Sequence, residues 1–324
     1  MGFTMVISLI HLFMRCKKYF FFVSFLFITP LAAAKPLTLI LDWLINPDQA
    51  ALFVAQAHHF FSKEGINVHI IAPTNPDDGP KLVAAGHADL ALSYQPQFVV
   101  QVSRGLPLIR IASLINHPLN CLLVKKNGPI RQLTDLRSKR IAYTSHAEGT
   151  LMLKGLLNKA HLTINDVQTI NVQYDLIQAL LTDRVDGVVN VMRNVEPLQM
   201  QYAHQPVKIF PVELAGIPHY DELIIIANKN QLHDSRLVKF LVALNQATSY
   251  LMTHPEKSWE LFAKDHPALN NELNHRIWQA TLPYLARYPV DFDKAAYQKF
   301  MLFLYRNKII SKKIKTEDYA IKLI

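Results

Sequence analysis

From residue 37 onward, short apolar runs alternate along the chain with amphipathic stretches of helical period. Leu37–Leu41 is a continuous apolar run typical of a strand buried on both faces. Further strands are expected at Val68–Ala72, Asp89–Leu92 and Leu108–Leu114. The stretches between them predict helices from Asp48, which can act as the cap, to about Lys63, from Lys81 to Ala85, and from Pro96 to near Gly105. This β-α-β-α-β-α-β order predicts a parallel sheet with right-handed crossovers.

The alternation restarts after Leu119–Val124, a segment that leaves the first group of strands. Further strands are expected at Arg140–Tyr143, Val167–Val172 and Val185–Val189, with helices beginning at Thr134 and spanning Gly149–Ala160, Leu176–Thr182 and Glu196–Ala203. Leu223–Ala227 then predicts a strand that returns the chain. The helical tail Ser235–Ile310 is interrupted at Pro255, Pro267 and Pro289 and is expected to pack on the first lobe.

This order predicts an α/β protein with two lobes, of the type II-like periplasmic-binding-protein architecture. The second lobe, residues 121–222, is inserted in the first, which comprises residues 35–120 and 223–324, and two crossover segments join them. A chain of about 290 residues after removal of a leader is longer than one core usually organises, which also favours two lobes.

The N-terminus has the features of an export signal. Basic residues at positions 15–18 precede the apolar run Tyr19–Ile28, which is about ten residues long and too short to span a bilayer. Ala32–Ala34 supplies small residues for a signal peptidase, so cleavage is expected before Lys35, and Met14 is a candidate for the true start. An uncleaved membrane anchor is the alternative. The signal predicts a periplasmic protein, and whether it is free or tethered stays open.

Charge and cysteine content remove several classes of protein. The formal net charge is +9 and falls to +6 without the leader. Only residues 308–315 are densely basic, which is typical of a solvated helix end, so no nucleic-acid partner is expected. Cys121 is the one cysteine after the leader, in an apolar run, so the sequence predicts no disulfide and a buried thiol.

No motif indicates catalysis or a cofactor. The chain contains no Gly-rich dinucleotide fingerprint, no phosphate loop and no Gly-x-Ser-x-Gly elbow. His58 and His59 are adjacent and would lie on different faces of a helix, so no metal site is expected there. Asp42, Glu196 and Glu222 could act as acids or bases, but no partner nucleophile accompanies them. The sequence predicts neither an enzyme nor a bound cofactor or metal.

Polar and aromatic residues gather instead at the ends of the predicted strands. They are Asp42, Trp43, Asn46, Ser93, Tyr94, Gln95, Asn116, His117, Asn120, Asn190, Asn194, Glu196, Tyr220 and Glu222. Ligands of open α/β sheets bind outside the carboxyl ends of strands, and aromatic faces with amides and carboxylates suit a flat polar heterocycle. Individually, Trp43 could belong to a core, Asp42 could cap a helix, Asn116 and Asn120 could form turns, and His117 could be a satisfied interior imidazole.

Several motifs resemble a known family: Leu41-Asp42-Trp43 with Asn46 and residues 50–56, residues 81–86, residues 89–97, residues 117–120 and residues 216–223. With these motifs the chain resembles the bacterial binding proteins for pyrimidine precursors of thiamine, which are receptors of ABC importers. The wider group also contains the eukaryotic-type hydroxymethylpyrimidine phosphate synthases. The resemblance covers nearly the whole chain after the leader, and residues 92–97, Leu-Ser-Tyr-Gln-Pro-Gln, are its most specific part.

The resemblance implies a binding protein that closes on its ligand and delivers it to an ABC transporter permease. It implies a pyrimidine stacked on Trp43 and Tyr94 and hydrogen-bonded by Asn46 and Glu196, with Tyr220 and Glu222 as further candidates. Residues 190–196 match the family least closely. A monomer is expected. The hydroxymethylpyrimidine and its formylaminomethyl relative are not distinguished by the sequence.

Two alternatives belong to related proteins. The synthases use pyridoxal phosphate and a histidine of their own chain, and carry a lysine and a histidine in the stretch that matches Ser93–Gln97, with a cysteine-rich segment farther on. This chain has neither lysine nor histidine in that stretch and no cysteine in residues 213–222. Related receptors for sulfonates, nitrate or taurine hold anions with positive groups, whereas Arg193 is the one arginine near the expected cleft.

Overall fold

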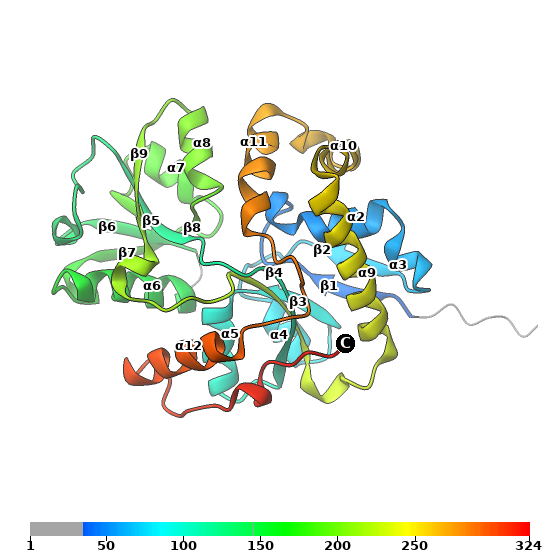
Figure 1. Ribbon diagram of the computed structural model, residues 1–324. Helices are drawn as coiled ribbons and strands as arrows, with labels where there is room; N and C mark the ends of the chain where they lie inside the picture. The colour runs from blue at the N-terminus through cyan, green and yellow to red at the C-terminus, as the bar shows by residue number, and fades with distance from the viewer. Residues whose placement is uncertain (1–34, 145) are drawn as a thin grey trace, which may run out of the picture. The chain divides into compact units, whose positions relative to one another are not determined.

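Two five-stranded sheets, one in each lobe, organise the chain (Figure 1). The computed structural model describes residues 35–144 and 146–324. The expected export signal lies outside the described residues. The predicted α/β fold class with two lobes is confirmed.

The first sheet has the strand order β2-β1-β3-β10-β4. Its strands are β1 (Leu37–Ile40), β2 (Val68–Ile71), β3 (Leu90–Ser93), β4 (Leu108–Ile115) and β10 (Leu223–Asn228). β1 is parallel to β2 and β3, as predicted, but β10 is antiparallel to both β3 and β4. β3 and β4 both run antiparallel to β10 and hence parallel to each other, so the four strands predicted as a parallel set are parallel. β10 runs the other way because it returns from the second lobe and enters the sheet from the opposite end.

The second sheet has the strand order β7-β6-β8-β5-β9. Its strands are β5 (Asn120–Lys125), β6 (Arg140–Tyr143), β7 (Gln168–Asn171), β8 (Gly187–Met192) and β9 (Val207–Pro211). The sequence analysis did not identify β9, which pairs antiparallel with β5 at the edge of the sheet. Its residues are mostly half-buried, as in an edge strand, so it lacks the continuous apolar run of a central strand.

Eleven α-helices lie in the described residues. They are α2 (Ala50–Ala57), α3 (Phe60–Lys63), α4 (Gly79–Ala84), α5 (Gln95–Ser103), α6 (His146–Lys159), α7 (Leu176–Leu181), α8 (Glu196–Tyr202), α9 (Ser235–Thr253), α10 (Pro255–Asp265), α11 (Glu272–Thr281) and α12 (Lys294–Arg306). The single helix expected from Asp48 to Lys63 is broken, because His59 has the left-handed φ of 59°. Asn46, and not Asp48, caps the short 3-10 helix η1 (Pro47–Gln49) that precedes α2.

Both faces of each sheet are covered, as alternating residues of single strands show. In β10, Leu223, Ile225 and Ala227 belong to the core beneath α2 and α9, whereas Ile224 and Ile226 belong to the core with α5 and α12. Side chains alternate between the faces of a strand, so both parities must be apolar when helices cover both sides. This pattern explains why the central strands could be predicted from continuous apolar runs.

The C-terminal tail contacts more of the protein than the sequence analysis expected. α9 and α10 pack against α2, and α12 contributes to the core of the first sheet, as predicted. α11, however, contacts both η1 of the first lobe and α8 of the second, and stands beside α8 in Figure 1. α11 thus packs on the first lobe, as expected of the tail, and in addition contacts the second lobe, which was not anticipated.

Candidate functional site

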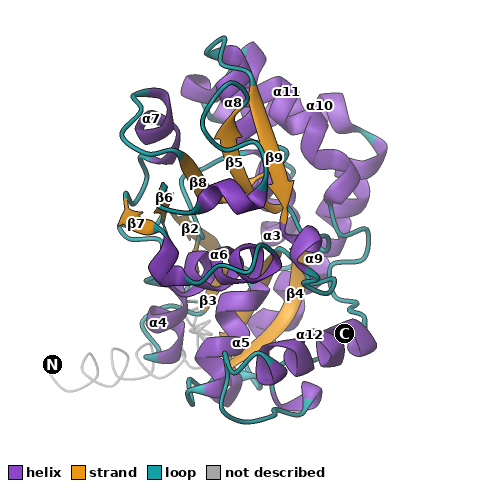
Figure 2. Cartoon of the chain, turned by 90° about the vertical axis from the view of Figure 1, so that its left-hand side faces the viewer, coloured by secondary structure: helices purple, strands orange, loops and turns teal. Residues whose placement is uncertain are grey.

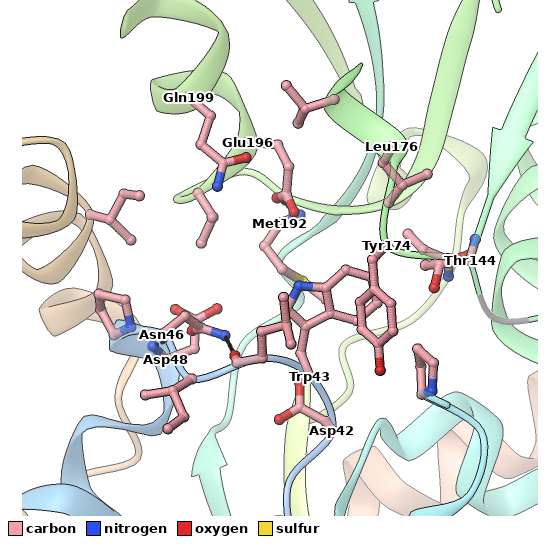
Figure 3. A pocket seen from close by; sticks show the side chains of 18 of the residues that line it. Asp42, Trp43, Asn46, Asp48, Thr144, Tyr174, Leu176, Met192, Glu196 and Gln199 are labelled. Carbon is pink, nitrogen blue, oxygen red and sulfur yellow. Dashed lines mark hydrogen bonds between the residues drawn. The ribbon is translucent and has the colours of Figure 1, made fainter. Parts of the chain in front are cut away.

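A cavity of about 390 Å³ lies between the two lobes and is lined by residues of both (Figure 3). Seven of the predicted site residues line it: Asp42, Trp43, Asn46, Tyr94, Asn190, Glu196 and Glu222. This volume is within the range of pockets that hold small organic molecules. In Figure 2, β5 and β9 of the second sheet are seen above β3 and β4 of the first.

The loop after β1 forms a hydrogen-bonded wall on the first lobe. Asp42 accepts hydrogen bonds from the Gln49 side chain at 2.9 Å and from the Tyr94 hydroxyl at 2.7 Å. The Asn46 side chain forms hydrogen bonds within its own loop: its Oδ1 accepts from the Asp48 backbone N–H and its Nδ2 donates to the Leu44 carbonyl. Burial raises the pKa of Asp42, and the two side-chain hydrogen bonds oppose that rise.

An aromatic pair joins the two lobes across the cavity. The rings of Trp43 and Tyr174 lie 4.5 Å apart between centroids, tilted by 54°, and face the cavity together in Figure 3. Tyr174 also donates a hydrogen bond to the Pro73 carbonyl of the first lobe at 2.9 Å. The family resemblance implies a pyrimidine stacked on Trp43 and Tyr94; both line the cavity, and the ring beside Trp43 is that of Tyr174. Both rings offer faces on which a flat ligand could stack.

Glu222 connects the two crossover segments and also lines the cavity. Its Oε2 accepts hydrogen bonds from the backbone N–H groups of Leu119 and Asn120 and from the Tyr220 hydroxyl. Its Oε1 is buried and has no hydrogen-bond partner among the described residues. Burial raises the pKa of Glu222 to about 7, against the effect of these hydrogen bonds. One oxygen thus fixes the side chain, while the other is left to accept a proton or hydrogen bond.

Two further carboxyls line the cavity near α8 and η1. One oxygen of Glu196 accepts from the Met192 backbone N–H at 2.7 Å, and burial raises its pKa to about 8. Burial raises the pKa of Asp48 to about 6, and the nearby Asp42 carboxyl adds to the rise. Burial therefore raises the pKa of Asp42, Asp48, Glu196 and Glu222, because water no longer solvates their charges.

No lysine or arginine is found among the described residues that line the cavity. Arg193, the cation considered in the sequence analysis, pairs with Glu213 at 2.6 Å and donates to the Leu119 carbonyl. The Arg193 charge is therefore paired with Glu213, beside the segment that connects the lobes. The arrangement favours ligands that bring hydrogen-bond donors or positive charge.

In the second lobe, a close approach of backbone segments holds Asn190 at the cavity. Asn190 lies within β8 and has a left-handed φ of 62°. Its Oδ1 accepts a hydrogen bond from the Thr144 backbone N–H at 3.3 Å. A Cβ at Gly149 would lie 2.3 Å from that Oδ1. Only glycine lets the first turn of α6 come this near.

Six of the predicted residues do not line the cavity: Ser93, Gln95, His117, Asn120, Asn194 and Tyr220. Ser93 and Gln95 are buried, and Gln95 accepts from the backbone N–H of Asp221. Tyr220 and Asn120 support Glu222, as described above. Asn116, also considered above, is likewise absent from the lining.

The remaining two residues have other surroundings. The His117 side chain is exposed and lies beside His219. Partial desolvation of its ring, and then the neighbouring His219, lower its pKa. Asn194 is buried and hydrogen-bonds Asp48 and Thr281. The rule that ligands bind beyond the carboxyl ends of strands therefore pointed to the residues around this cavity. It could not determine which of their side chains line the cavity.

Several lining residues were missed: Asp48, Thr144, Tyr174, Gln178, Gln199, Leu273, Asn274 and Ile277. Thr144 and Tyr174 follow the ends of β6 and β7, so the rule that identified the other residues could have found them. Leu273, Asn274 and Ile277 lie on α11, in a helical tail with no strand-end signal.

Two further observations concern metal binding and membrane insertion. In residues 35–144 and 146–324, no group of three or more His, Cys, Asp or Glu side chains could hold a metal ion. Within the same part of the chain, no helix has the length and apolar character needed to cross a membrane.

The two lobes and the cavity between them define a protein of the periplasmic-binding-protein fold. The alkanesulfonate-binding protein SsuA from Xanthomonas axonopodis pv. citri matches it with a TM-score of 0.71 and 14% identity, over 89% of this chain and 99% of that chain. At this identity the match establishes the fold alone.

The chain belongs to the NMT1/THI5-like family, whose model matches residues 46–258. It is 41% identical, over 94% of this chain and 98% of the relative, to a Haemophilus influenzae protein named for thiamine biosynthesis. It is 28% identical to the formylaminopyrimidine-binding protein of Halalkalibacterium halodurans, over 78% of this chain and 77% of that protein. The resemblance read from the motifs is thereby confirmed at the level of the family.

The family also includes enzymes. The 4-amino-5-hydroxymethyl-2-methylpyrimidine phosphate synthase of Legionella pneumophila is 26% identical, over 79% of this chain and 82% of the enzyme. The choice between a binding protein and an enzyme must therefore come from the site itself.

Proposed function

We propose that the chain is an exported solute-binding protein that captures a pyrimidine precursor of thiamine between its lobes and delivers it to an ABC importer. The ligand-binding lobes would be residues 35–120 with 223–324, and residues 121–222. The export signal at residues 1–34 would place the protein in the periplasm, where the transporter permease is its partner. The protein would act as a monomer.

The observation that carries this proposal is the composition of the interlobe cavity. A 4-aminopyrimidine is flat, and it offers an amine that donates hydrogen bonds and ring nitrogens that take up a proton. Trp43 and Tyr174 supply aromatic faces, and buried Glu222 and Glu196 supply acceptors with raised pKa values. A carboxyl can accept from the amine and share a proton with the adjacent ring nitrogen.

In this assignment Trp43 and Tyr174 stack on the ring, and the free Oε1 of Glu222 accepts one hydrogen bond. Glu196 approaches from α8 on the second lobe, where Figure 3 shows it facing the cavity with Gln199. Contacts from both lobes would stabilise the closed form, which is the form a transporter can distinguish from the open one.

The same cavity disfavours the two alternatives. Pyridoxal phosphate chemistry needs a lysine amine for a Schiff base, and no lysine is among the described lining residues. Sulfonate, nitrate and taurine receptors need positive groups for their anions, whereas five carboxyls line this cavity. The proposal therefore assigns binding rather than synthesis.

A thermal-shift titration of residues 35–324 tests the proposal. The two aminopyrimidines, with hydroxymethyl and formylaminomethyl groups, should each be compared with thiamine, taurine and pyridoxal phosphate. A saturable rise in melting temperature with an aminopyrimidine is expected, and the tighter one names the ligand. A rise with pyridoxal phosphate alone would favour the synthase, and a rise with taurine alone would favour the sulfonate receptors. A Trp43→Ala control should lose the pyrimidine response, and Trp43→Phe should keep most of it.

A further inference from the structure

A cluster of three buried side chains joins the lobes beside the cavity. Asn194 lies between β8 and α8 of the second lobe, Asp48 lies in η1 of the first lobe, and Thr281 ends α11. Their exposed fractions are 3%, 7% and 1%. Three segments far apart in the sequence thus meet in one place that excludes water.

The cluster is a closed triangle of hydrogen bonds. Asn194 Nδ2 donates to Asp48 Oδ1 at 2.7 Å and to Thr281 Oγ1 at 2.8 Å. Thr281 Oγ1 donates in turn to the same Asp48 oxygen at 2.9 Å. Each member therefore contacts both of the others. Loss of one hydroxyl or amide would leave buried polar groups unpaired, which costs more than the hydrogen bond itself.

One member of the triangle, Asp48, also lines the cavity. Neither Asn194 nor Thr281 does. α11 extends this connection, since it contacts η1 and α8 and places Leu273, Asn274 and Ile277 in the cavity wall. Thr281 and the lining residues of α11 lie beyond residue 258, where the match to the family model ends.

We propose that Asp48, Asn194 and Thr281 form a latch that holds the two lobes closed around the ligand. Asn194 and Thr281 are positioning residues, because they act through Asp48 and α11 and not on the ligand. The proposal rests on the proposed function, since the latch retains whatever the cavity has captured. When the lobes separate, Asn194 leaves Asp48 and Thr281, and water solvates all three.

The latch predicts a kinetic effect. Opening must break the triangle before the ligand can leave, so its loss should raise the dissociation rate more than it lowers the association rate. One lost hydrogen bond at a closed interface corresponds to about a fivefold to thirtyfold faster release. Because the members act as a unit, the double variant should release the ligand little faster than either single variant.

The experiment uses the full chain, purified after expression, and two readouts. Small-angle scattering is recorded with and without the formylaminomethyl pyrimidine, and stopped-flow fluorescence measures its release. The variants are Thr281→Val, Asn194→Ala and the pair. Thr281→Ser retains the hydroxyl and should restore wild-type behaviour. Thr253→Val is the matched control, because the Thr253 hydroxyl hydrogen-bonds only within α9 and to the adjacent His254.

The expected result is a larger radius of gyration and faster release in Thr281→Val and Asn194→Ala, with Thr281→Ser and Thr253→Val unchanged. Wild-type scattering and release in both single variants would overturn the latch. If one single variant fails to fold, the other and the Thr281→Ser rescue still decide. If wild-type protein binds no pyrimidine, the proposed function fails, while scattering of the ligand-free variants still tests the latch: a wild-type profile already as expanded as theirs overturns it.

Discussion

The two walls of the cavity are built differently. On the first lobe, Gln49 and Tyr94 both donate hydrogen bonds to Asp42, so that wall is fixed within its own lobe. On the second lobe, Tyr174 and Asn194 make hydrogen bonds that reach across to the first lobe. The difference indicates that the first lobe carries a preorganised wall of the site, whereas the second lobe completes the site when the lobes close.

The largest effect is expected for Asp42→Ala, in the wall of the first lobe. It would leave the Gln49 amide and the Tyr94 hydroxyl without their acceptor in a buried position, and should lower the free energy of unfolding by about 3 kcal/mol. Chemical denaturation measures this loss, with Asp265→Ala on the exposed end of α10 as the control. If the two variants are equally stable, the first wall is not held by its internal hydrogen bonds.

Trp43→Ala should act on affinity and leave stability nearly unchanged. Removal of one stacking face should weaken pyrimidine binding by about 2 kcal/mol, or roughly thirtyfold. Isothermal titration measures the dissociation constant, and Trp43→Phe should recover most of it. Unfolding of the Trp43→Ala protein would instead assign Trp43 to the core, which is the alternative that the sequence left open.

Gly149→Ala tests how α6 is fitted to the second wall. The new Cβ would lie 2.3 Å from Asn190 Oδ1 and 2.9 Å from Tyr143 Cβ, so α6 or Asn190 must move. We expect a loss of about 1.5 kcal/mol in the free energy of unfolding and weaker pyrimidine binding. Gly128→Ala, in a turn between β5 and η2 (Leu133–Leu136), should leave binding unchanged. Unaltered binding in Gly149→Ala would separate Asn190 from the site.

Tyr174→Phe should have a smaller effect, confined to closure. It keeps the ring beside Trp43 but removes the hydrogen bond to the Pro73 carbonyl, worth about 1 kcal/mol. The dissociation constant should rise about fivefold, with no change in the free energy of unfolding. Tyr202→Phe, on an exposed ring, is the matched control. Equal affinities of the two variants would contradict a role for Tyr174 in closing the cleft.

The free energy of unfolding of the ligand-free protein should change gradually with pH. Asp48, Glu222 and Glu196 have folded pKa values of about 6, 7 and 8, above unfolded values of about 4. The unfolded chain therefore loses these protons first, so the stability they contribute is fully present below about pH 4 and is lost as the pH rises through 6 to 8. Denaturation curves should show a falling free energy of unfolding, with a shallower fall in Glu196→Gln between pH 7 and 8. Parallel curves would show that Glu196 is not desolvated in the folded protein.

The sequence predicted the fold well where the elements are continuous. β1, β3, β4 and β10 are buried on both faces, so their apolar runs could be read directly. β9 was missed because its edge position leaves it half-buried, and the helix break at His59 was missed because nothing in the local pattern requires a left-handed residue there.

The site was predicted in part. Asp42, Trp43 and Tyr94 follow the ends of strands of one sheet, which is the rule that located them. Neighbouring side chains such as Ser93 and Gln95 point into the core instead, and only the backbone trace decides which residue turns outward. Contacts from α11 could not be predicted at all, because they depend on how a helical tail crosses from one lobe to the other.

Hydrogen–deuterium exchange reports directly whether both lobes close on a pyrimidine in the cavity. Exchange is measured on the chain with and without a saturating concentration of the formylaminomethyl pyrimidine. With ligand bound, we predict slower amide exchange in both lobes: in residues 42–49 of the first lobe and in residues 174–178 and 190–199 of the second. Exchange in α12 should change little. Protection confined to one lobe, or located away from these segments, would contradict the account.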